Sequence, residues 1–261
     1  MNLHNFEKVY ENSSKISIRV YVILRIAIIV CLVRELFLQN YNNALLCVLS
    51  LILFLIPIFI KDKFKINMPT AIETTIFCFI FSAEILGEIS NFYGNIYIWD
   101  SILHTINGFL CAAVGFNLIN LLNNKIKDLS LTPLFVAIFA FCFSMTIGVC
   151  WEFIEFSLDK YIFADSQKDR IVQTISTVEL DPIQDNNVVV IKNINHTIIY
   201  DKDNNELATI NGGYLELGII DTMKDLFVNL IGAIVFSIMG YLYITDSKKY
   251  NFAEKFKIKK V

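Results

Sequence analysis

The sequence lacks the short motifs that mark the commonest hydrolases and thiolate metal sites. No GxSxG or HExxH motif occurs in its 261 residues, which argues against a serine nucleophile elbow and a zincin. No CxxC pair occurs, so zinc bound by thiolates is not expected. Glycine and proline are sparse, and no internal repeat or low-complexity tract is present. The sequence therefore predicts one membrane domain with one insertion.

The most abundant feature is apolar sequence, with 55% hydrophobic residues and a mean hydropathy of +0.55. This composition predicts an integral membrane protein rather than a soluble domain. A membrane-spanning helix needs roughly 20 mostly apolar residues. Six stretches meet that length, near residues 17–38, 43–60, 70–90, 98–122, 131–157 and 219–244. The fold class is therefore an all-α polytopic membrane protein with six transmembrane helices.

Basic residues alternate between connections, and this alternation predicts the orientation. The connections at residues 39–43 and 91–97 contain no Lys or Arg. Because cytoplasmic loops carry the excess of Lys and Arg, both termini are expected in the cytoplasm. The short basic clusters give no broad cationic face, so nucleic acid is not an expected partner. The basic positions used are Lys8, Lys15, Arg19, Lys61, Lys63, Lys65, Lys125, Lys127 and those from Lys248 to Lys260.

A polar segment at residues 159–218 separates the membrane domain of residues 1–158 from the sixth helix at 219–245, and residues 246–261 form a basic cytoplasmic tail. Three short runs in that segment, 188–191, 197–200 and 207–210, are rich in β-branched or apolar residues, which predicts a hairpin or a three-stranded meander. Such small β elements are marginal alone. We therefore expect this extracytoplasmic insertion to pack on the helix bundle or on an extracytoplasmic partner.

The six cysteines all lie in the apolar spans, which favours packing thiols over a set of disulfides. They are Cys31, Cys47, Cys78, Cys111, Cys142 and Cys150.

Four spans carry ionisable pairs one helical turn apart, toward the end that the orientation places outside the cell. Spacings of three or four residues put both members of a pair on one helix face, about 5–6 Å apart at Cβ. Ionisable groups in spans are costly and mark functional sites by default. The pairs are Glu84/Glu88, Asp100/His104, Glu152/Glu155 and Asp221/Asp225.

So many like charges at one depth need compensation, either by protonation or by a bound cation. A donor set of carboxylates with one imidazole and no thiolate suits Mg²⁺ or Mn²⁺, and Zn²⁺ less well. We assign Asp100, His104, Glu152 and Asp221 as metal ligands and Glu155 and Asp225 as catalytic proton-handling residues. Supporting residues are Glu84, Glu88, Arg34 and Asn229. Ion pairs that only hold helices together are the structural alternative for each pair.

These spans contain a three-part pattern. Its parts are Trp99-Asp100-x-x-x-His104-x-x-x-Gly108, Trp151-Glu152-Phe153-Ile154-Glu155, and the run from Asp221 and Asp225 through Asn229 to Gly232-Ala233. The pattern resembles that of the YjdF-like bacterial inner-membrane protein family of unknown function. The resemblance implies a multi-pass protein of the bacterial cytoplasmic membrane, with these acids and the histidine as its shared motif. It implies no catalytic role.

Three functions are compatible with this pattern. The first is a divalent-metal-dependent enzyme that acts on a lipid or envelope substrate at the outer leaflet. The second is a cation- or proton-coupled transporter, in which the acids form an entry site. The third is an accessory membrane protein with a structural cation site. The sequence gives neither the substrate nor the oligomeric state.

Overall fold

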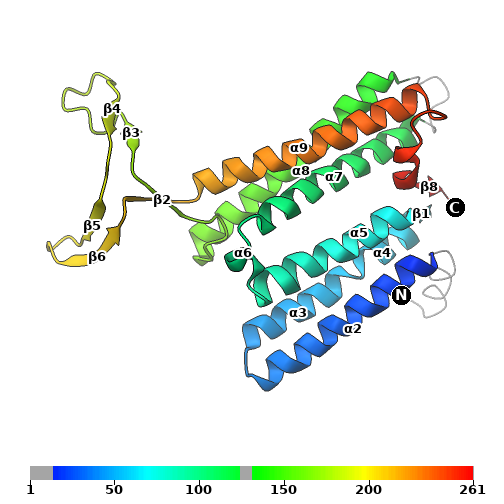
Figure 1. Cartoon of the computed structure of the whole chain (residues 1–261), viewed down its shortest axis with the longest axis horizontal. Helices are drawn as coiled ribbons and strands as arrows, with labels where there is room; N and C mark the ends of the chain where they lie inside the picture. Colours follow the sequence, from blue (N-terminus) through cyan, green and yellow to red (C-terminus); the bar gives the residue numbers. More distant parts are fainter. Residues whose placement is uncertain (1–13, 124–130, 261) are drawn as a thin grey trace. The chain divides into compact units, whose positions relative to one another are not determined.

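The computed structural model describes residues 14–123 and 131–260, without the side chains of Asn123, Lys259 and Lys260. Within this part of the chain, six helical segments are long and apolar enough to cross a membrane, as predicted. Their bounds agree with the predicted spans to within a few residues (Figure 1). Lys8, Lys125 and Lys127, which entered the orientation argument, lie outside the described residues.

Inter-residue contacts divide the chain into two compact units, residues 1–148 with 225–261 and residues 149–224. Each unit is described by itself. The first unit holds α2 (Lys15–Phe37), α3 (Tyr41–Leu53), α4 (Ile56–Phe64), α5 (Thr70–Ile80), the π-helix η1 (Phe81–Ile89), α6 (Phe92–Asn95) and α7 (Trp99–Asn123). The helices α8 (Pro133–Ile162) and α9 (Ile219–Thr245) contribute to both units.

The second span is broken into α3 and α4 at Phe54 and Leu55, and Pro57 gives the reason. Proline has no N–H to donate, and its ring clashes with the carbonyl four residues earlier, which here belongs to Leu53. The residues just before Pro57 form a turn, and α4 then continues with Pro57 in its first turn. This break is compatible with one spanning segment from Tyr41 to Phe64.

Two apolar clusters form the core of the first unit. One lies among α7, α8 and α9 and is built of small and aromatic residues, Ala112, Ala113, Phe116, Ile119, Val136, Ala140, Ala233 and Phe236. The other joins α2, α3, α4, α5 and η1 through Tyr21, Ile28, Cys47, Phe54, Ile58, Phe77 and Ile85. Many large apolar side chains, such as Ile23, Phe59 and Leu134, are more than half exposed, as expected for surfaces that face lipid.

The C-terminal segment, predicted only as a basic tail, is folded. After α9, residues Phe252–Phe256 form the short 3₁₀-helix η2. The strand β8 (Lys259–Lys260) then pairs antiparallel with β1 (Ile66–Asn67), which lies between α4 and α5.

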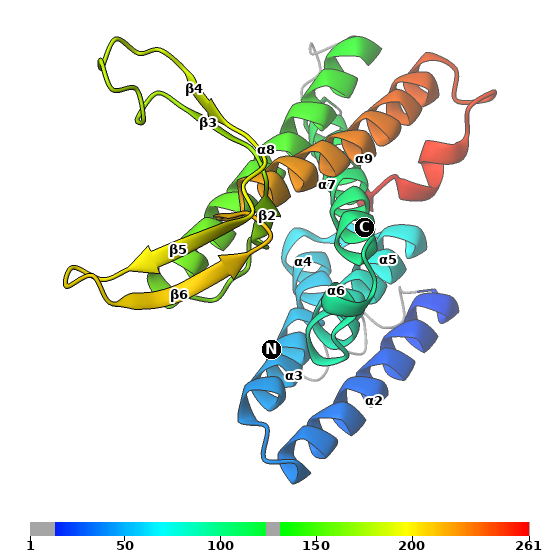
Figure 2. The same ribbon diagram turned by 60° about the vertical axis from the view of Figure 1, so that its left-hand side comes forward.

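The second unit contains the insertion, which forms separate two-stranded ribbons and not a meander. In the described chain, β2 (Arg170–Val172) pairs with β7 (Tyr214–Glu216), β3 (Ile175–Thr177) with β4 (Val189–Ile191), and β5 (His196–Tyr200) with β6 (Glu206–Asn211). The predicted hairpin is therefore confirmed for β5 and β6 (Figure 2). The predicted meander is wrong, because β4 takes β3 as its partner.

Two aspartates of the insertion hold its irregular turns. Asp159, near the end of α8, accepts hydrogen bonds from the backbone N–H groups of Ser166 and Gln167. Asp181 accepts N–H bonds from Asn187, Ile183 and Asp185 in the turn between β3 and β4. The Asn187 N–H makes the largest contribution to holding the pKa of Asp181 below its usual range.

A buried ion pair joins three helix ends of the first unit. Lys61 Nζ of α4 donates to Glu73 Oε1 of α5 at 2.9 Å, and the Ser17 hydroxyl of α2 donates to Glu73 Oε2 at 2.5 Å. Both charged side chains are only 4% exposed. The start of α2, the end of α4 and the start of α5 therefore meet at one end of the bundle. We call this the basic end, because Lys15, Arg19, Lys63 and Lys65 also lie on these helix ends.

We predict that removing one partner of this pair destabilises the protein far more than removing both. Lys61→Met should lower the free energy of unfolding by about 3–5 kcal/mol, because it leaves the Glu73 carboxylate buried without its cation. Lys61→Met/Glu73→Leu should recover most of that loss. Thermal unfolding in detergent measures both effects, with Lys65→Met at an exposed ion pair as the control. Equal losses in the single and double variants would contradict this prediction.

Candidate metal site on helices α7 and α9

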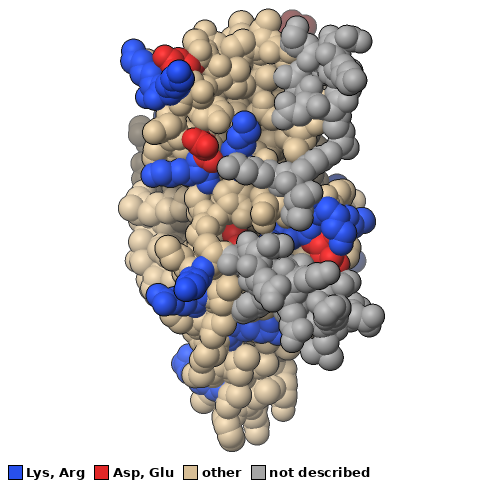
Figure 3. Space-filling view, turned by 90° about the vertical axis from the view of Figure 1, so that its right-hand side faces the viewer, with Lys and Arg blue, Asp and Glu red and all other residues tan. Residues whose placement is uncertain are grey.

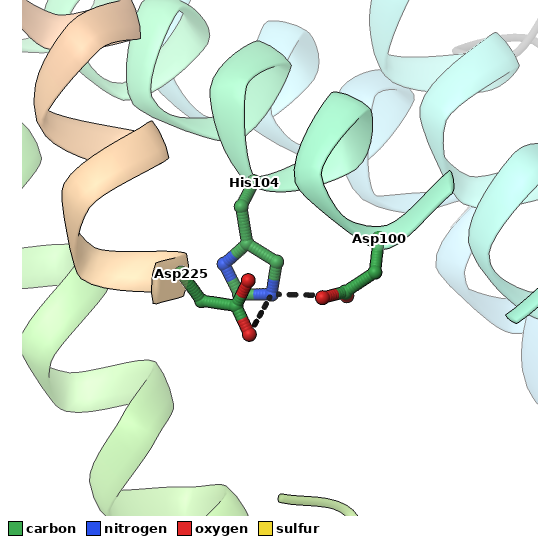
Figure 4. A group of neighbouring side chains, drawn as sticks. All are labelled: Asp100, His104 and Asp225. Carbon is green, nitrogen blue, oxygen red and sulfur yellow. Dashed lines mark ion pairs between the residues drawn. The ribbon is translucent and has the colours of Figure 1, made fainter. Parts of the chain in front are cut away.

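Asp100, His104 and Asp225 come together in the first unit. Asp100 lies in the first turn of α7, His104 one turn later on the same face, and Asp225 on α9. His104 Nε2 is 3.5 Å from Asp100 Oδ1 and 3.9 Å from Asp225 Oδ2. Figure 4 shows the imidazole edge facing both carboxylates. One ligand atom from each residue lies within 4.8 Å of the other two, so the three side chains could hold one metal ion.

The three side chains differ in exposure. Asp225 is nearly enclosed, with 3% of its side chain exposed, while His104 is 12% and Asp100 27% exposed. The cluster therefore opens on the side of Asp100, near the start of α7. A site open on one side gives room for water or for a small polar group of a substrate.

A close crossing of α7 and α9 places the histidine beside Asp225. At Gly108 of α7 an added Cβ would overlap the carbonyl group of Asn229, and at Gly232 of α9 it would overlap the carbonyl oxygen of Thr105. Small residues at such positions let helix backbones approach closely inside a membrane. The Ser144 hydroxyl of α8 donates to the Gly108 carbonyl at 2.7 Å, which ties a third helix to the crossing. These contacts lie one turn from His104 and two turns from Asp225.

Asn229 lies one turn below Asp225 on α9 and is almost fully buried. Its side-chain oxygen accepts a hydrogen bond from Asn107 Nδ2 at 3.4 Å, and its own Nδ2 is 3.6 Å from the sulfur of Met145. A Cβ at Gly148 would touch the Asn229 amide, so this glycine makes room for it. Asn229 is thus a buried polar residue one turn beyond Asp225, and the apolar residues around Phe236 follow on α9.

Metal–ligand bonds of about 2.0–2.2 Å put adjacent ligand atoms roughly 3 Å apart, so the separations of 3.5 and 3.9 Å from His104 to the two carboxylates would have to shorten around a bound ion. Without a cation, a protonated His104 would form ion pairs with both carboxylates. The metal-bound cluster and the metal-free cluster with a protonated His104 are both chemically reasonable. Only the metal-bound cluster could support metal-assisted chemistry.

The other predicted pair of the first unit lies in the π-helix η1. Glu84 is partly buried and Glu88 is exposed. The Trp99 indole N–H donates to the Ser82 carbonyl at 3.3 Å, so η1 is tied to the residue just before Asp100. The sequence prediction assumed an α-helix with 3.6 residues per turn throughout this span, so it missed the wider π-helical turns. π-Helical segments are frequent at functional sites, and in this chain the segment carries both glutamates.

Arg34 and Glu35 form a separate contact at the end of α2. Arg34 is 3.3 Å from the buried Glu35 carboxylate, which also accepts from Asn43 Nδ2 at 3.2 Å. Arg34 thus pairs with Glu35 at the junction of α2 and α3. Its supporting role at the metal site stays a prediction.

Glu152, Glu155 and Asp221 belong to the second unit, and their convergence with Asp100 and His104 stays a prediction. Glu152 is buried, whereas Glu155 accepts a hydrogen bond from the Trp151 indole at 2.7 Å. Asp221 is engaged by cations, with Arg170 at 3.4 Å and Lys224 at 3.6 Å from its carboxylate.

The backbone N–H of Lys168 also donates to Asp221 at 3.0 Å. The contacts with Arg170 and Lys168 link the start of α9 to the chain around β2. Asp221 thus anchors the insertion to α9, and its predicted role as a metal ligand stays a prediction.

The spans and the cluster together define a multi-pass membrane protein with a carboxylate and histidine group on two of its helices. The chain belongs to the family described as Predicted membrane protein (DUF2238), whose sequence profile matches residues 19–246. This match confirms the resemblance to an uncharacterised membrane protein family.

A protein of Thermotoga maritima, described as Uncharacterized protein, is 31% identical to this chain over 83 residues. The match covers 32% of this chain and 41% of that protein, so this chain spans about two fifths of that relative's length. No solved structure matches the chain.

We predict that Gly232→Ala separates His104 from Asp225, because its Cβ can fit only if α7 and α9 move apart. Overpacking of this kind costs about 1–3 kcal/mol of stability. Thermal unfolding measures that cost, and a distance between spin labels at the starts of α7 and α9 measures the separation. Ile231→Ala, at an exposed neighbouring position, is the control. An unchanged distance in Gly232→Ala would show that the glycine crossing does not set the site.

Proposed function

We propose that the protein binds a divalent cation through Asp100, His104 and Asp225. With this cation it would act as a metal-dependent enzyme on a lipid or envelope substrate. The observation that carries the proposal is the meeting of three ligand atoms within 4.8 Å, contributed by two helices that are far apart in the sequence. The two carboxylates favour Mg²⁺ or Mn²⁺, and the imidazole makes Zn²⁺ the next choice. This assignment moves Asp225 from proton transfer to ligation.

The enclosure of the site favours a bound cation. Asp225 is 3% exposed, and burial of a carboxylate is costly unless a cation or a proton compensates its charge. A divalent ion would compensate both aspartates at once and leave His104 neutral. With three protein ligands, it would keep coordination positions open on the exposed side of Asp100.

Open coordination positions are what a metal-assisted hydrolysis or transfer reaction requires. A cation bound there would lower the pKa of a coordinated water and polarise an ester or phosphoryl oxygen of the substrate. The site lies in the first turns of α7, at the depth where lipid headgroups meet a span. A lipid or an envelope group can therefore reach it from the membrane surface.

The location of the protein forms part of this proposal. The basic end of the bundle would face the cytoplasm, with both termini there, and the cluster and the insertion would face outward in a bacterial cytoplasmic membrane. The insertion would then be the part of the chain that meets an extracytoplasmic partner.

A polar route across the membrane would favour transport instead. In the described residues, Asn107 donates to Asn229 one turn beyond Asp225, and the apolar cluster around Phe116 and Phe236 follows. A proton or cation pathway would need polar groups through this layer. The one-sided arrangement therefore favours an enzyme over a transporter.

Metal content tests the proposal directly. Detergent-purified protein, equilibrated with Mg²⁺, Mn²⁺ or Zn²⁺ and desalted, should retain about one ion per chain by elemental mass spectrometry. Asp100→Asn/His104→Ala should lose it, because two of three ligands are gone. The matched control is Asp203→Asn/His196→Ala, which makes the same chemical changes at exposed positions of the insertion.

Three outcomes are decisive. An ion lost only in the site variant supports the cation site and justifies a screen of lipid and envelope esters for hydrolysis. An ion retained equally in all three proteins is bound elsewhere and contradicts the assignment. Protein free of metal at matched folding also contradicts it, and a protonated His104 between two carboxylates would then describe the cluster.

A further inference from the structure

The folded C-terminal segment is docked against the basic end of the bundle by one buried amide. Asn117 of α7 is 2% exposed, and its Nδ2 donates to the Phe256 carbonyl at 2.8 Å. The Ile258 backbone N–H donates back to Asn117 Oδ1 at 2.6 Å. A side-chain amide that pairs with a backbone carbonyl and a backbone N–H fixes the position of that segment. We call residues 251–258 the strap.

Aromatic packing also holds the strap. The Phe256 ring lies 5.2 Å from Phe109 and 5.7 Å from Phe236, in edge-to-face contacts with α7 and α9. Ala253 is 1% exposed. The pairing of β8 with β1 then connects the far end of the strap to the junction of α4 and α5. The strap is therefore an ordered part of the membrane domain, in contact with its helices on both sides.

The docked strap packs Phe256 against the helices and leaves Lys255 exposed. Lys255, adjacent to Phe256, is exposed, and Lys257 lies 5.6 Å from the Tyr243 ring centre. Lys248 and Lys249 are exposed in the turn that follows α9. Figure 3 shows this face of the protein with Lys and Arg side chains around it and few acidic ones.

The neighbouring helix ends add further exposed cations. Lys15, Arg19, Lys63 and Lys65 lie on α2, at the end of α4 and just after it. Among the described residues of this end, the acids outside the buried ion pair are Asp62, Asp246 and Glu254. Asp62 pairs with Lys65, and Asp246 accepts from the backbone N–H groups of Lys248 and Lys249. The exposed charge at the basic end is thus strongly positive.

We propose that the docked strap and the basic helix ends around it form a binding surface for anionic phospholipid headgroups. Clusters of Lys and Arg at the end of a membrane span attract acidic lipids through charge complementarity. The new element is the strap, because Asn117 and Phe256 hold Lys255 and Lys257 at fixed positions beside the helix ends. A loose basic tail would bring the same charges without a defined site. The proposal does not depend on the cation site of α7 and α9.

The test separates the effect of the lysine charges from the effect of their fixed positions on the strap. Full-length protein in mixed micelles is offered phosphatidylglycerol and phosphatidylcholine, and retained lipids are counted by native mass spectrometry. Lys249→Gln/Lys255→Gln removes two exposed charges and leaves the Asn117 contacts in place. It should weaken phosphatidylglycerol retention roughly fivefold for each lysine, without an effect on phosphatidylcholine. Lys192→Gln/Lys202→Gln makes the same change in the insertion and should have no effect.

A second variant keeps every charge and releases the strap. Asn117→Ala/Phe256→Ala should lower the preference for phosphatidylglycerol as strongly as the loss of two lysines, because Lys255 and Lys257 lose their fixed positions. If this variant does not fold, Ile258→Pro takes its place, because proline lacks the N–H that bonds to Asn117 and leaves every charge unchanged.

The outcomes distinguish the two parts of the proposal, which are the lipid-binding surface and the role of the docked strap in it. An unchanged lipid preference in the lysine variant would overturn the binding surface. A preference that falls in the lysine variant and persists after strap release would overturn the role of docking. Loss of preference in both, with the insertion variant unaffected, is the expected result.

Discussion

Polar and charged side chains inside a bilayer must find partners within the protein, because hydrocarbon offers none. This constraint accounts for most of the specific contacts of the membrane domain. Glu73 takes Lys61 and a serine hydroxyl, and the buried Asn117 takes the backbone of the strap. Asp100 and Asp225 both face the imidazole of His104. The first two sets tie one element of the fold to another, whereas the third brings three possible ligand atoms within 4.8 Å of one another. That geometry is the physical reason to propose a cation for the third set.

The helices α7 and α9 connect the two ends of the domain. Their crossing at Gly108 and Gly232 brings His104 to Asp225, and their opposite halves hold the strap through Asn117 and Phe236. Small residues serve the site by allowing a close approach, and large aromatic residues serve the strap by filling space. One pair of helices therefore positions both surfaces for which we propose ligands. The acidic cluster would receive a divalent cation and the basic end anionic lipids, so the two proposals place opposite charges at opposite ends.

The sequence predicted the spans well, because length and apolar composition alone decide which segments can cross a membrane. It also predicted the same-face pairing of Asp100 and His104, which depends only on helical spacing. It assigned Asp225 to the same site for proton transfer, but it could not predict that the Asp225 carboxylate lies beside His104 as a possible ligand, since that requires the rotation of α9 against α7. The break at Pro57 had a local signal in the proline itself. The strap had one too, in the spacing of Phe252 and Phe256 among lysines, but the partner Asn117 is more than 130 residues away. The pairing of β3 with β4 was missed because β3 is only three residues long.

The central claim is that His104 is a metal ligand, and pulsed electron paramagnetic resonance of Mn²⁺-loaded protein tests it most directly. The chain has three histidines, His4, His104 and His196, so a nitrogen signal can be assigned with few variants. The account predicts a coupling from one imidazole nitrogen that disappears in His104→Ala and persists in His196→Ala. Bound Mn²⁺ without nitrogen coupling, or with a coupling that survives in His104→Ala, would contradict it.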